Sequence, residues 1–145
     1  MPEKIDGWIG VDLDGVLARH NPHSGKWDKD YIGDPIPKMI EKVEKALAEG
    51  KEIKIFTARV GTGRGLSPIS GYEDTQEFAD HQRRIIQDWT LEHLGVRLDV
   101  TAQKDWALIE IWDDRARQVV INTGEFVEDF WRDLFAYIYG RLGGG

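Results

Sequence analysis

Short apolar runs alternate along the chain with longer segments in which apolar residues recur at helical spacing. Such runs are typical of buried strands, and they occur at residues 8–12, 53–56, 96–100, 107–112 and 118–121. Helical spacing occurs at residues 35–49, 74–94 and 125–141. Gly50 and Gly95 follow the first two of these segments, as expected where a helix ends. The pattern therefore predicts strands and helices in alternation.

This alternation predicts the class of fold. Strands that are joined through helices form right-handed crossovers and pair in parallel. We therefore expect an α/β fold, a Rossmann-like three-layer sandwich with a mainly parallel five-stranded sheet and helices on both faces. Ligands of such sheets bind beyond the carboxyl ends of the strands. Two acidic pairs, Asp12 with Asp14 and Asp113 with Asp114, follow predicted strands and are expected at that edge.

The length of 145 residues suits one domain of ordinary size. We expect that domain to cover residues 1–142, followed by a flexible tail at residues 143–145. Within the domain, turn-forming residues predict a flap at about residues 16–34 and a mobile glycine-rich loop at about residues 59–74.

Composition narrows the classes of function. A formal net charge of −7 argues against long-range attraction to nucleic-acid phosphates, although a local basic patch or a metal still suits a single phosphate. The absence of cysteine excludes disulfides, thiolate metal sites and a cysteine nucleophile. No apolar run approaches the roughly 18–20 residues that cross a bilayer, and residues 1–6 lack the pattern of a secretory signal. We therefore expect a cytoplasmic protein that does not bind membranes.

The acidic pairs are the strongest candidates for chemistry. Asp12 and Asp14 are two residues apart, so an extended chain places both side chains on one face. Because close carboxylates repel, the pair suits a bound cation or a retained proton, and so a nucleophile, a metal ligand or a general acid. A turn with solvated acids fits the pair equally well. Asp113 and Asp114 suit a cation for the same reason, and the alternative there is a helix N-cap at Asp114.

Two further polar residues lie next to predicted strands. Thr57 directly follows residues 53–56, and Lys104 lies in the short link before residues 107–112. Each residue alone is commonplace in such a position. Together with the acids, however, they bring carboxylates, a hydroxyl and a cation to one sheet edge. That set suits Mg²⁺ and a phosphoryl group.

These residues stand in motifs that resemble those of the haloacid dehalogenase superfamily, and specifically its phosphatases. The family's first motif is similar to Gly10-Val11-Asp12-Leu13-Asp14-Gly15-Val16-Leu17, its second to Ile55-Phe56-Thr57-Ala58-Arg59, its third to Lys104, and its fourth to Ile111-Trp112-Asp113-Asp114-Arg115-Ala116. All four occur in the family's order, and the resemblance covers about residues 7–122. Only eight residues separate Lys104 from Asp113, where larger members place a helix. Small phage and bacterial members show a similarly compact arrangement.

The resemblance implies a Mg²⁺-dependent phosphomonoesterase that works through an aspartyl-phosphate intermediate. Asp12 is then the nucleophile, and Asp14 first protonates the leaving oxygen and later activates the hydrolytic water. The implied metal ligands are the Asp12 carboxylate, the Asp14 backbone carbonyl and Asp113, with Asp114 close by.

Other residues are expected to contact the phosphate or the rest of the substrate. The resemblance implies that Thr57 and Lys104 bind the phosphoryl oxygens, with Arg59 and Lys26 as alternative cations. The candidate substrate contacts in the flap and the glycine-rich loop are Lys26, Trp27, Arg59 and Arg64. Trp27 either offers a stacking face for a base or packs against the core.

Family members often carry an inserted cap domain, and both gaps between the motifs are too short for one here. We therefore expect a capless site, which suits a large substrate, a partner that acts as a lid, or modest turnover, and disfavours transfer to acceptors other than water. The acidic motifs also resemble the phosphatase half of phage polynucleotide kinase-phosphatases. Nucleotides and nucleic-acid 3′-phosphates are therefore candidate substrates, beside sugar phosphates. The alternative function is a catalytically quiet binding or regulatory module, and the sequence leaves open a monomer or a dimer.

Overall fold

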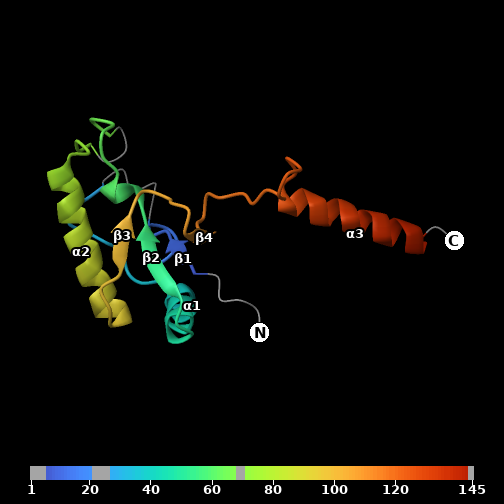
Figure 1. Cartoon of the computed structure of the whole chain (residues 1–145), viewed down its shortest axis with the longest axis horizontal. Helices are drawn as coiled ribbons and strands as arrows, with labels where there is room; N and C mark the ends of the chain where they lie inside the picture. Colours follow the sequence, from blue (N-terminus) through green and yellow to red (C-terminus); the bar gives the residue numbers. More distant parts are fainter. Residues whose placement is uncertain (1–5, 21–26, 68–70, 144–145) are drawn as a thin grey trace. The chain divides into compact units, whose positions relative to one another are not determined.

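The computed structural model describes residues 6–20, 27–67 and 71–143 (Figure 1). The chain divides into two compact units, Met1–Asp114 and Arg115–Gly145. The single domain predicted over residues 1–142 spans both units. Of the residues singled out above, Lys26 and the last two tail glycines lie outside the described residues, and Gly143 is the last residue of a helix.

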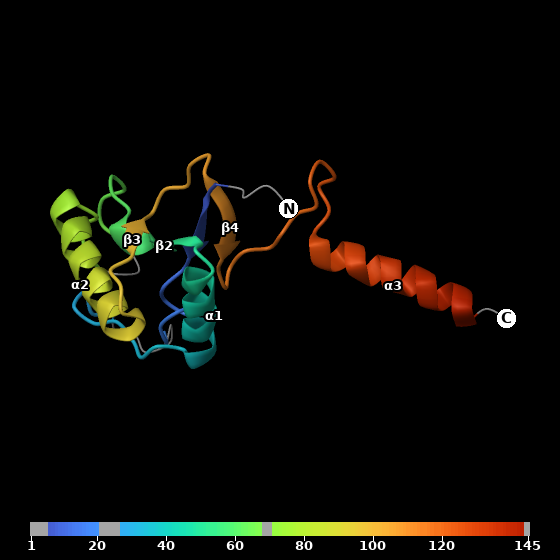
Figure 2. The same cartoon turned by 60° about the horizontal axis from the view of Figure 1, so that its bottom comes forward.

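The first unit contains a four-stranded parallel sheet (Figures 1 and 2). Its strands are β1 (Trp8–Val11), β2 (Glu52–Phe56), β3 (Asp99–Thr101) and β4 (Leu108–Trp112), in the order β3-β2-β1-β4. The predicted α/β class and parallel pairing are therefore confirmed, and all four residues of β1 are buried, as their continuous apolar run indicates.

The fifth strand predicted at residues 118–121 is not formed. Among the described residues, this segment makes only an isolated antiparallel bridge between Val119 and Phe126. The chain reverses too soon for a strand, because Asn122 and Gly124 both have positive φ angles, 62° and 75°. The apolar run at residues 118–121 thus belongs to a tight turn.

The two helices of the first unit begin and end at recognisable signals. They are α1 (Pro37–Ala48) and α2 (Gln76–Leu94). Pro37 stands in the first turn of α1, where its missing N–H has no helical partner to lose. The Thr75 hydroxyl caps α2 by accepting a hydrogen bond from the Phe78 N–H. Gly95 ends α2 in the left-handed conformation that favours glycine.

Both helices lie on one face of the sheet. The two crossovers step in the same direction, from β1 to β2 and from β2 to β3, and consecutive right-handed crossovers place their helices on the same side. In agreement, α1 contacts β2, α2 contacts β3, and the two helices contact each other. The core between helices and sheet includes Ile9, Val11, Val43, Ala46, Ile53, Ile55 and Ile86. The described part of this unit therefore forms two of the three predicted layers.

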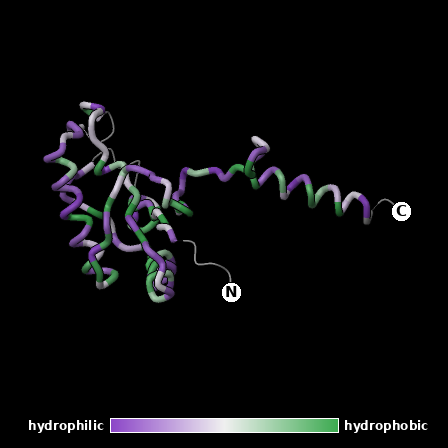
Figure 3. Tube along the Cα trace, in the orientation of Figure 1, coloured by the Kyte–Doolittle hydropathy of each residue, from purple (hydrophilic) through white to green (hydrophobic). Residues whose placement is uncertain are grey.

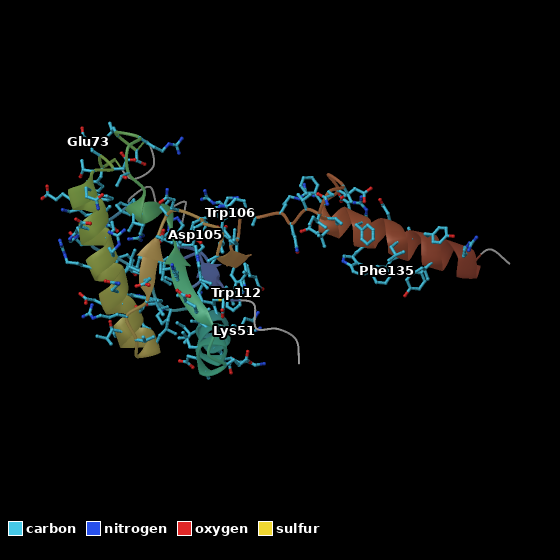
Figure 4. All side chains as sticks on the ribbon, in the orientation of Figure 1. Lys51, Glu73, Asp105, Trp106, Trp112 and Phe135 are labelled. Atoms are coloured by element: carbon cyan, nitrogen blue, oxygen red, sulfur yellow. The ribbon has the colours of Figure 1, made fainter. Side chains whose placement is uncertain are left out.

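The link between β3 and β4 crosses the sheet, because these strands occupy opposite edges (Figures 1 and 2). Trp8 anchors this link: its indole Nε1 donates to Asp105 Oδ1 at 2.9 Å, and its backbone N–H donates to the Ala107 carbonyl at 2.8 Å. Figure 4 labels Asp105 and Trp106 on the link. Trp8 is 2% exposed. The segment that carries Lys104 is flanked by β3 and β4, so both of its ends are fixed by the sheet.

The second unit contains the turn at residues 118–127 and α3 (Val127–Gly143). Hydrophobic and hydrophilic residues alternate along α3 (Figure 3). Trp131, Phe135 and Tyr139 are exposed and follow one another at the four-residue spacing of a helix face, with Phe135 labelled in Figure 4. None of the helices in the described residues combines the length and the apolar character that a bilayer crossing requires.

We expect the core between sheet and helices to carry most of the stability of the first unit. Ile55 on β2 is fully buried, so Ile55→Ala should lower the free energy of unfolding by about 2–5 kcal/mol through lost burial and a cavity. Ile109 on β4 is 49% exposed, and Ile109→Ala serves as the matched control with an expected loss under about 1 kcal/mol. Urea denaturation of both variants measures the difference, and equal losses would contradict this assignment of the core.

Candidate active site

Backbone pairing between β1 and β4 brings three acids together. The Asp12 N–H donates to the Trp112 carbonyl at 2.9 Å, so the pairing continues one residue past the end of β1. Asp12 therefore lies beside Asp113 and Asp114, which follow β4. One carboxylate oxygen from each of the three residues lies within 4.8 Å of the others. We call these three residues the acidic cluster.

Burial and neighbouring acids make ionisation of Asp12 unfavourable. Burial, and then the negative charge of Asp113, raise the pKa of Asp12 from 3.8 to about 7. The Leu13 N–H donates to Asp12 Oδ1 at 2.9 Å and partly opposes this shift. Asp12 therefore retains its proton up to near-neutral pH unless a cation stabilises its charge.

The donor set of the acidic cluster fits Mg²⁺. Carboxylate oxygens are the hard ligands that this cation prefers, and desolvated carboxylates gain most from its charge. Gly15 leaves room for one of them: a Cβ at this position would lie 3.0 Å from Asp114 Oδ2. Gly15 also has a φ angle of 87°, which favours glycine. The turn after β1 is thus shaped to allow Asp114 close to its backbone.

Asp14 is the one predicted site acid whose carboxylate is outside the acidic cluster. Residues 13–18 form a turn in which the N–H groups of Val16, Leu17 and Ala18 all donate to the Leu13 carbonyl. The extended geometry assumed for residues 12–14 therefore ends at Asp12, and Asp14 does not join the acidic cluster, although its negative charge still contributes to the raised pKa of Asp12. Both oxygens of Asp14 accept hydrogen bonds of 2.7 Å from Arg59, one from Nε and one from Nη2.

Thr57 and Arg59 follow β2 and lie close together. The Thr57 N–H donates to the Thr101 carbonyl at 2.9 Å, which extends the pairing of β2 with β3. The Thr57 Oγ1 accepts from the Arg59 N–H at 3.2 Å and so caps the short 3₁₀ helix Ala58–Val60. Thr57 thus lies at the same sheet edge as the acidic cluster, with its hydroxyl hydrogen still available as a donor.

The predicted cations have different surroundings. Arg59 has a side chain that is 7% exposed, and its three side-chain nitrogens all donate to groups of the protein itself. Its expected contact with substrate stays a prediction. Lys104 and Arg64 are exposed, and neither side chain forms a hydrogen bond or an ion pair with the described residues. Lys104 and Arg64 therefore remain candidates for a phosphate contact.

Trp27 packs among other aromatic side chains. Its ring centroid lies 5.8 Å from that of Tyr72 and 6.1 Å from that of Phe78. The guanidinium carbon of Arg59 lies 4.9 Å from the centroid of the same ring. These contacts favour the packing interpretation of Trp27 over a stacking face for a base.

The sequence interpretation missed Gln82, which is fully buried in α2. Its Oε1 accepts from Arg59 Nη1 at 3.1 Å, and its Nε2 donates to the Lys29 carbonyl at 2.7 Å. A signal was present, because Gln82 interrupts the apolar face of the helix between Ala79 and Ile86, and a polar residue on such a face is unusual.

A groove of about 300 Å³ lies between α2 and the loop before α1. Its lining includes Asp30, Tyr31, Asp88 and Trp89, and no member of the acidic cluster. Asp30 and Asp88 are already paired there, with His81 and Arg97 respectively. This groove is therefore separate from the candidate site.

No family model, curated protein or solved structure matches this chain. Function is therefore inferred from the residues of the site and their geometry.

The raised pKa of Asp12 has a consequence for stability. Because the folded-state pKa of about 7 exceeds the unfolded value of 3.8, Asp12 lowers the free energy of unfolding as the pH rises from about 4 to about 7. Asp12→Asn removes the ionisable group, and with it this loss in the free energy of unfolding. Without divalent cations, we expect the variant to be more stable than wild type at pH 8, on the order of 1 kcal/mol because solvent screens the partly exposed group.

Urea denaturation in EDTA at pH 4 and pH 8 measures this difference. The advantage of Asp12→Asn should be present at pH 8 and shrink towards pH 4, and Mg²⁺ should reduce it at pH 8 by stabilising the wild type. Asp99→Asn, at an exposed position of β3, controls for the removal of one negative charge. An Asp12→Asn variant less stable than wild type at pH 8 would argue against a strained acidic cluster.

Proposed function

We propose that this protein is a Mg²⁺-dependent phosphomonoesterase of the haloacid dehalogenase type. The observation that carries the proposal is the acidic cluster, in which carboxylates from the ends of β1 and β4 lie within 4.8 Å of one another. It lies at the carboxyl edge of a parallel sheet, where ligands of α/β proteins bind. The order of the four motifs along the chain also supports the proposal.

The acidic cluster would hold the cation through Asp12, Asp113 and Asp114, with the Asp14 backbone carbonyl as a further ligand. Bound Mg²⁺ would supply positive charge to the phosphoryl oxygens and to the surrounding carboxylates. In that setting the ionised form of Asp12 becomes the favoured one, which is the form that a nucleophile needs.

The first chemical step belongs to Asp12. Its carboxylate oxygen attacks phosphorus, a bond from that oxygen to phosphorus forms, and the bond from phosphorus to the substrate oxygen breaks. The leaving oxygen takes a proton from Asp14. Arg59 donates to one lone pair on each Asp14 oxygen. Each oxygen has a further lone pair, and one of these can hold the proton that Asp14 transfers.

The second step hydrolyses the aspartyl-phosphate. Asp14 accepts a proton from water, the water oxygen attacks phosphorus, and the bond to Asp12 breaks to restore the carboxylate. Thr57 and Lys104 would bind the phosphoryl oxygens during both steps. The exposed Arg64 is a further candidate for a contact with the substrate. A nucleotide or a nucleic-acid 3′-phosphate is a candidate substrate, as is a sugar phosphate.

Phosphate release from p-nitrophenyl phosphate tests the proposal. We expect turnover by the wild type with Mg²⁺, no turnover with EDTA, and a loss of roughly 10³-fold or more in Asp12→Asn, because the nucleophile is removed. Asp99→Asn should retain wild-type activity, since Asp99 is an exposed residue of β3.

Turnover that survives in Asp12→Asn would exclude this mechanism. If no variant and no wild-type protein turns over aryl phosphates, nucleotides or 3′-phosphorylated oligonucleotides, the proposed enzyme is rejected in favour of a catalytically quiet module.

A further inference from the structure

Gln82 is a buried amide whose two ends are both bonded. It lies on the face of α2 that packs on the sheet, with an exposed fraction of 0%. Buried polar groups persist where they are hydrogen-bonded, and an apolar residue would fill this position without that requirement. The amide oxygen faces Arg59 Nη1, and the amide nitrogen faces the Lys29 carbonyl. The side chain thus connects α2, Arg59 and the loop before α1.

Arg59 links Gln82 to Asp14, because it donates hydrogen bonds to both side chains. Its guanidinium is planar, so fixing one nitrogen fixes the plane of the others. Gln82 holds Nη1, while Nε and Nη2 donate to the two Asp14 oxygens and Nη2 also donates to the Tyr31 carbonyl at 3.2 Å. The bidentate pair is short and largely buried, which is the geometry in which such pairs hold a carboxylate in one orientation.

We propose that Gln82 is a positioning residue for proton transfer, acting through Arg59 on the orientation of the Asp14 carboxylate. The inference rests on the proposed function, in which Asp14 serves the leaving oxygen. The same contacts tie the loop at Lys29 and Tyr31 to the orientation of Asp14, because both backbone carbonyls accept from this network. Among the described residues, the side chain of Gln82 forms hydrogen bonds with Arg59 and the Lys29 carbonyl and with no member of the acidic cluster, so its role is positioning and not catalysis.

A positioning role of this kind depends on the leaving group. Alkyl phosphates need a proton on the departing alkoxide, whereas p-nitrophenolate departs without one. A misoriented Asp14 should therefore slow the first step, which kcat/KM reports, selectively for alkyl phosphates, because small displacements of an acid–base group cost large factors in rate. The second step, in which Asp14 activates water, is common to both kinds of substrate and affects kcat. A merely structural defect would slow both kinds of substrate alike.

The test compares kcat/KM for β-glycerophosphate and p-nitrophenyl phosphate in Gln82→Met and Gln82→Glu. Methionine keeps the length and volume of the side chain but loses both hydrogen bonds, and glutamate keeps an acceptor for Arg59. We expect Gln82→Met to lower kcat/KM for the alkyl substrate roughly tenfold or more and kcat/KM for the aryl substrate less than about threefold. Gln82→Glu keeps the acceptor for Arg59 but loses the donor to the Lys29 carbonyl, so it should recover part of the alkyl kcat/KM.

Thr90→Val is the matched control for the loss of a buried polar side chain of α2. Thr90 is also fully buried, and its Oγ1 bonds the Gln87 carbonyl and the Leu98 N–H, away from Arg59. This variant should lose stability and keep the wild-type ratio of alkyl to aryl rates. An unchanged ratio in Gln82→Met, or equal losses on both substrates, would overturn the proposal.

Labelling by phenylglyoxal tests the network without relying on activity or on the folding of a variant. In the wild type, Arg59 should react at least about tenfold more slowly than exposed Arg64, as followed by peptide mass spectrometry. Equal rates would overturn the proposal. If Arg59 is protected but the wild type turns over neither phosphate, the proposed function has failed and the positioning role falls with it. If turnover is present and the rate ratio is unaltered, the positioning role alone has failed.

Discussion

Three carboxylates within 4.8 Å of one another repel, and the whole candidate site is organised around that repulsion. The backbone brings the three carboxylates together. The hydrogen bond from the Asp12 N–H to the Trp112 carbonyl extends the pairing of β1 with β4 to the point where the acids begin. Burial strengthens the repulsion by removing water from Asp12, whose pKa rises to about 7. A cation bound by the three carboxylates would offset this repulsion. We therefore propose that this sheet edge receives one.

Asp14 forms an ion pair and is not a member of the acidic cluster. Arg59 binds both oxygens of its carboxylate, although its charge still contributes to the raised pKa of Asp12. Two neighbouring aspartates can thereby perform different tasks, because one faces other acids and the other faces a guanidinium. The ion pair is in turn held by Gln82 and by backbone carbonyls of the loop before α1. The site therefore depends on contacts from α2, although α2 contributes no group to the acidic cluster.

The strands β1, β2 and β4 could be predicted from sequence within one residue at either end, because a continuous apolar run is typical of a buried strand. The run at residues 96–100 predicted the third strand too early, since β3 spans Asp99–Thr101. The fifth strand failed for a local reason: the positive φ angles of Asn122 and Gly124 reverse the chain directly after the apolar run at residues 118–121. The different surroundings of Asp12 and Asp14 were missed because a spacing of two residues places side chains on one face only where the chain is extended. The turn that begins at Leu13 ends this extended geometry. The partners of Arg59 were missed because they come from segments far apart in sequence, brought together only by the packing of α2. Composition could not show that this arginine is buried and paired with Asp14, and so suited to orient it.

The central claim is that the acidic cluster binds a divalent cation, and calorimetric titration of Mg²⁺ tests it directly. The comparison is between wild type, Asp113→Asn and Asp99→Asn at pH 8, with all proteins first treated with EDTA. We expect one cation to bind the wild type and Asp99→Asn with similar affinity, and binding to Asp113→Asn to be at least about tenfold weaker, because one of three converging carboxylates is neutralised. Absence of binding to the wild type, or equal affinity in Asp113→Asn, would contradict the account.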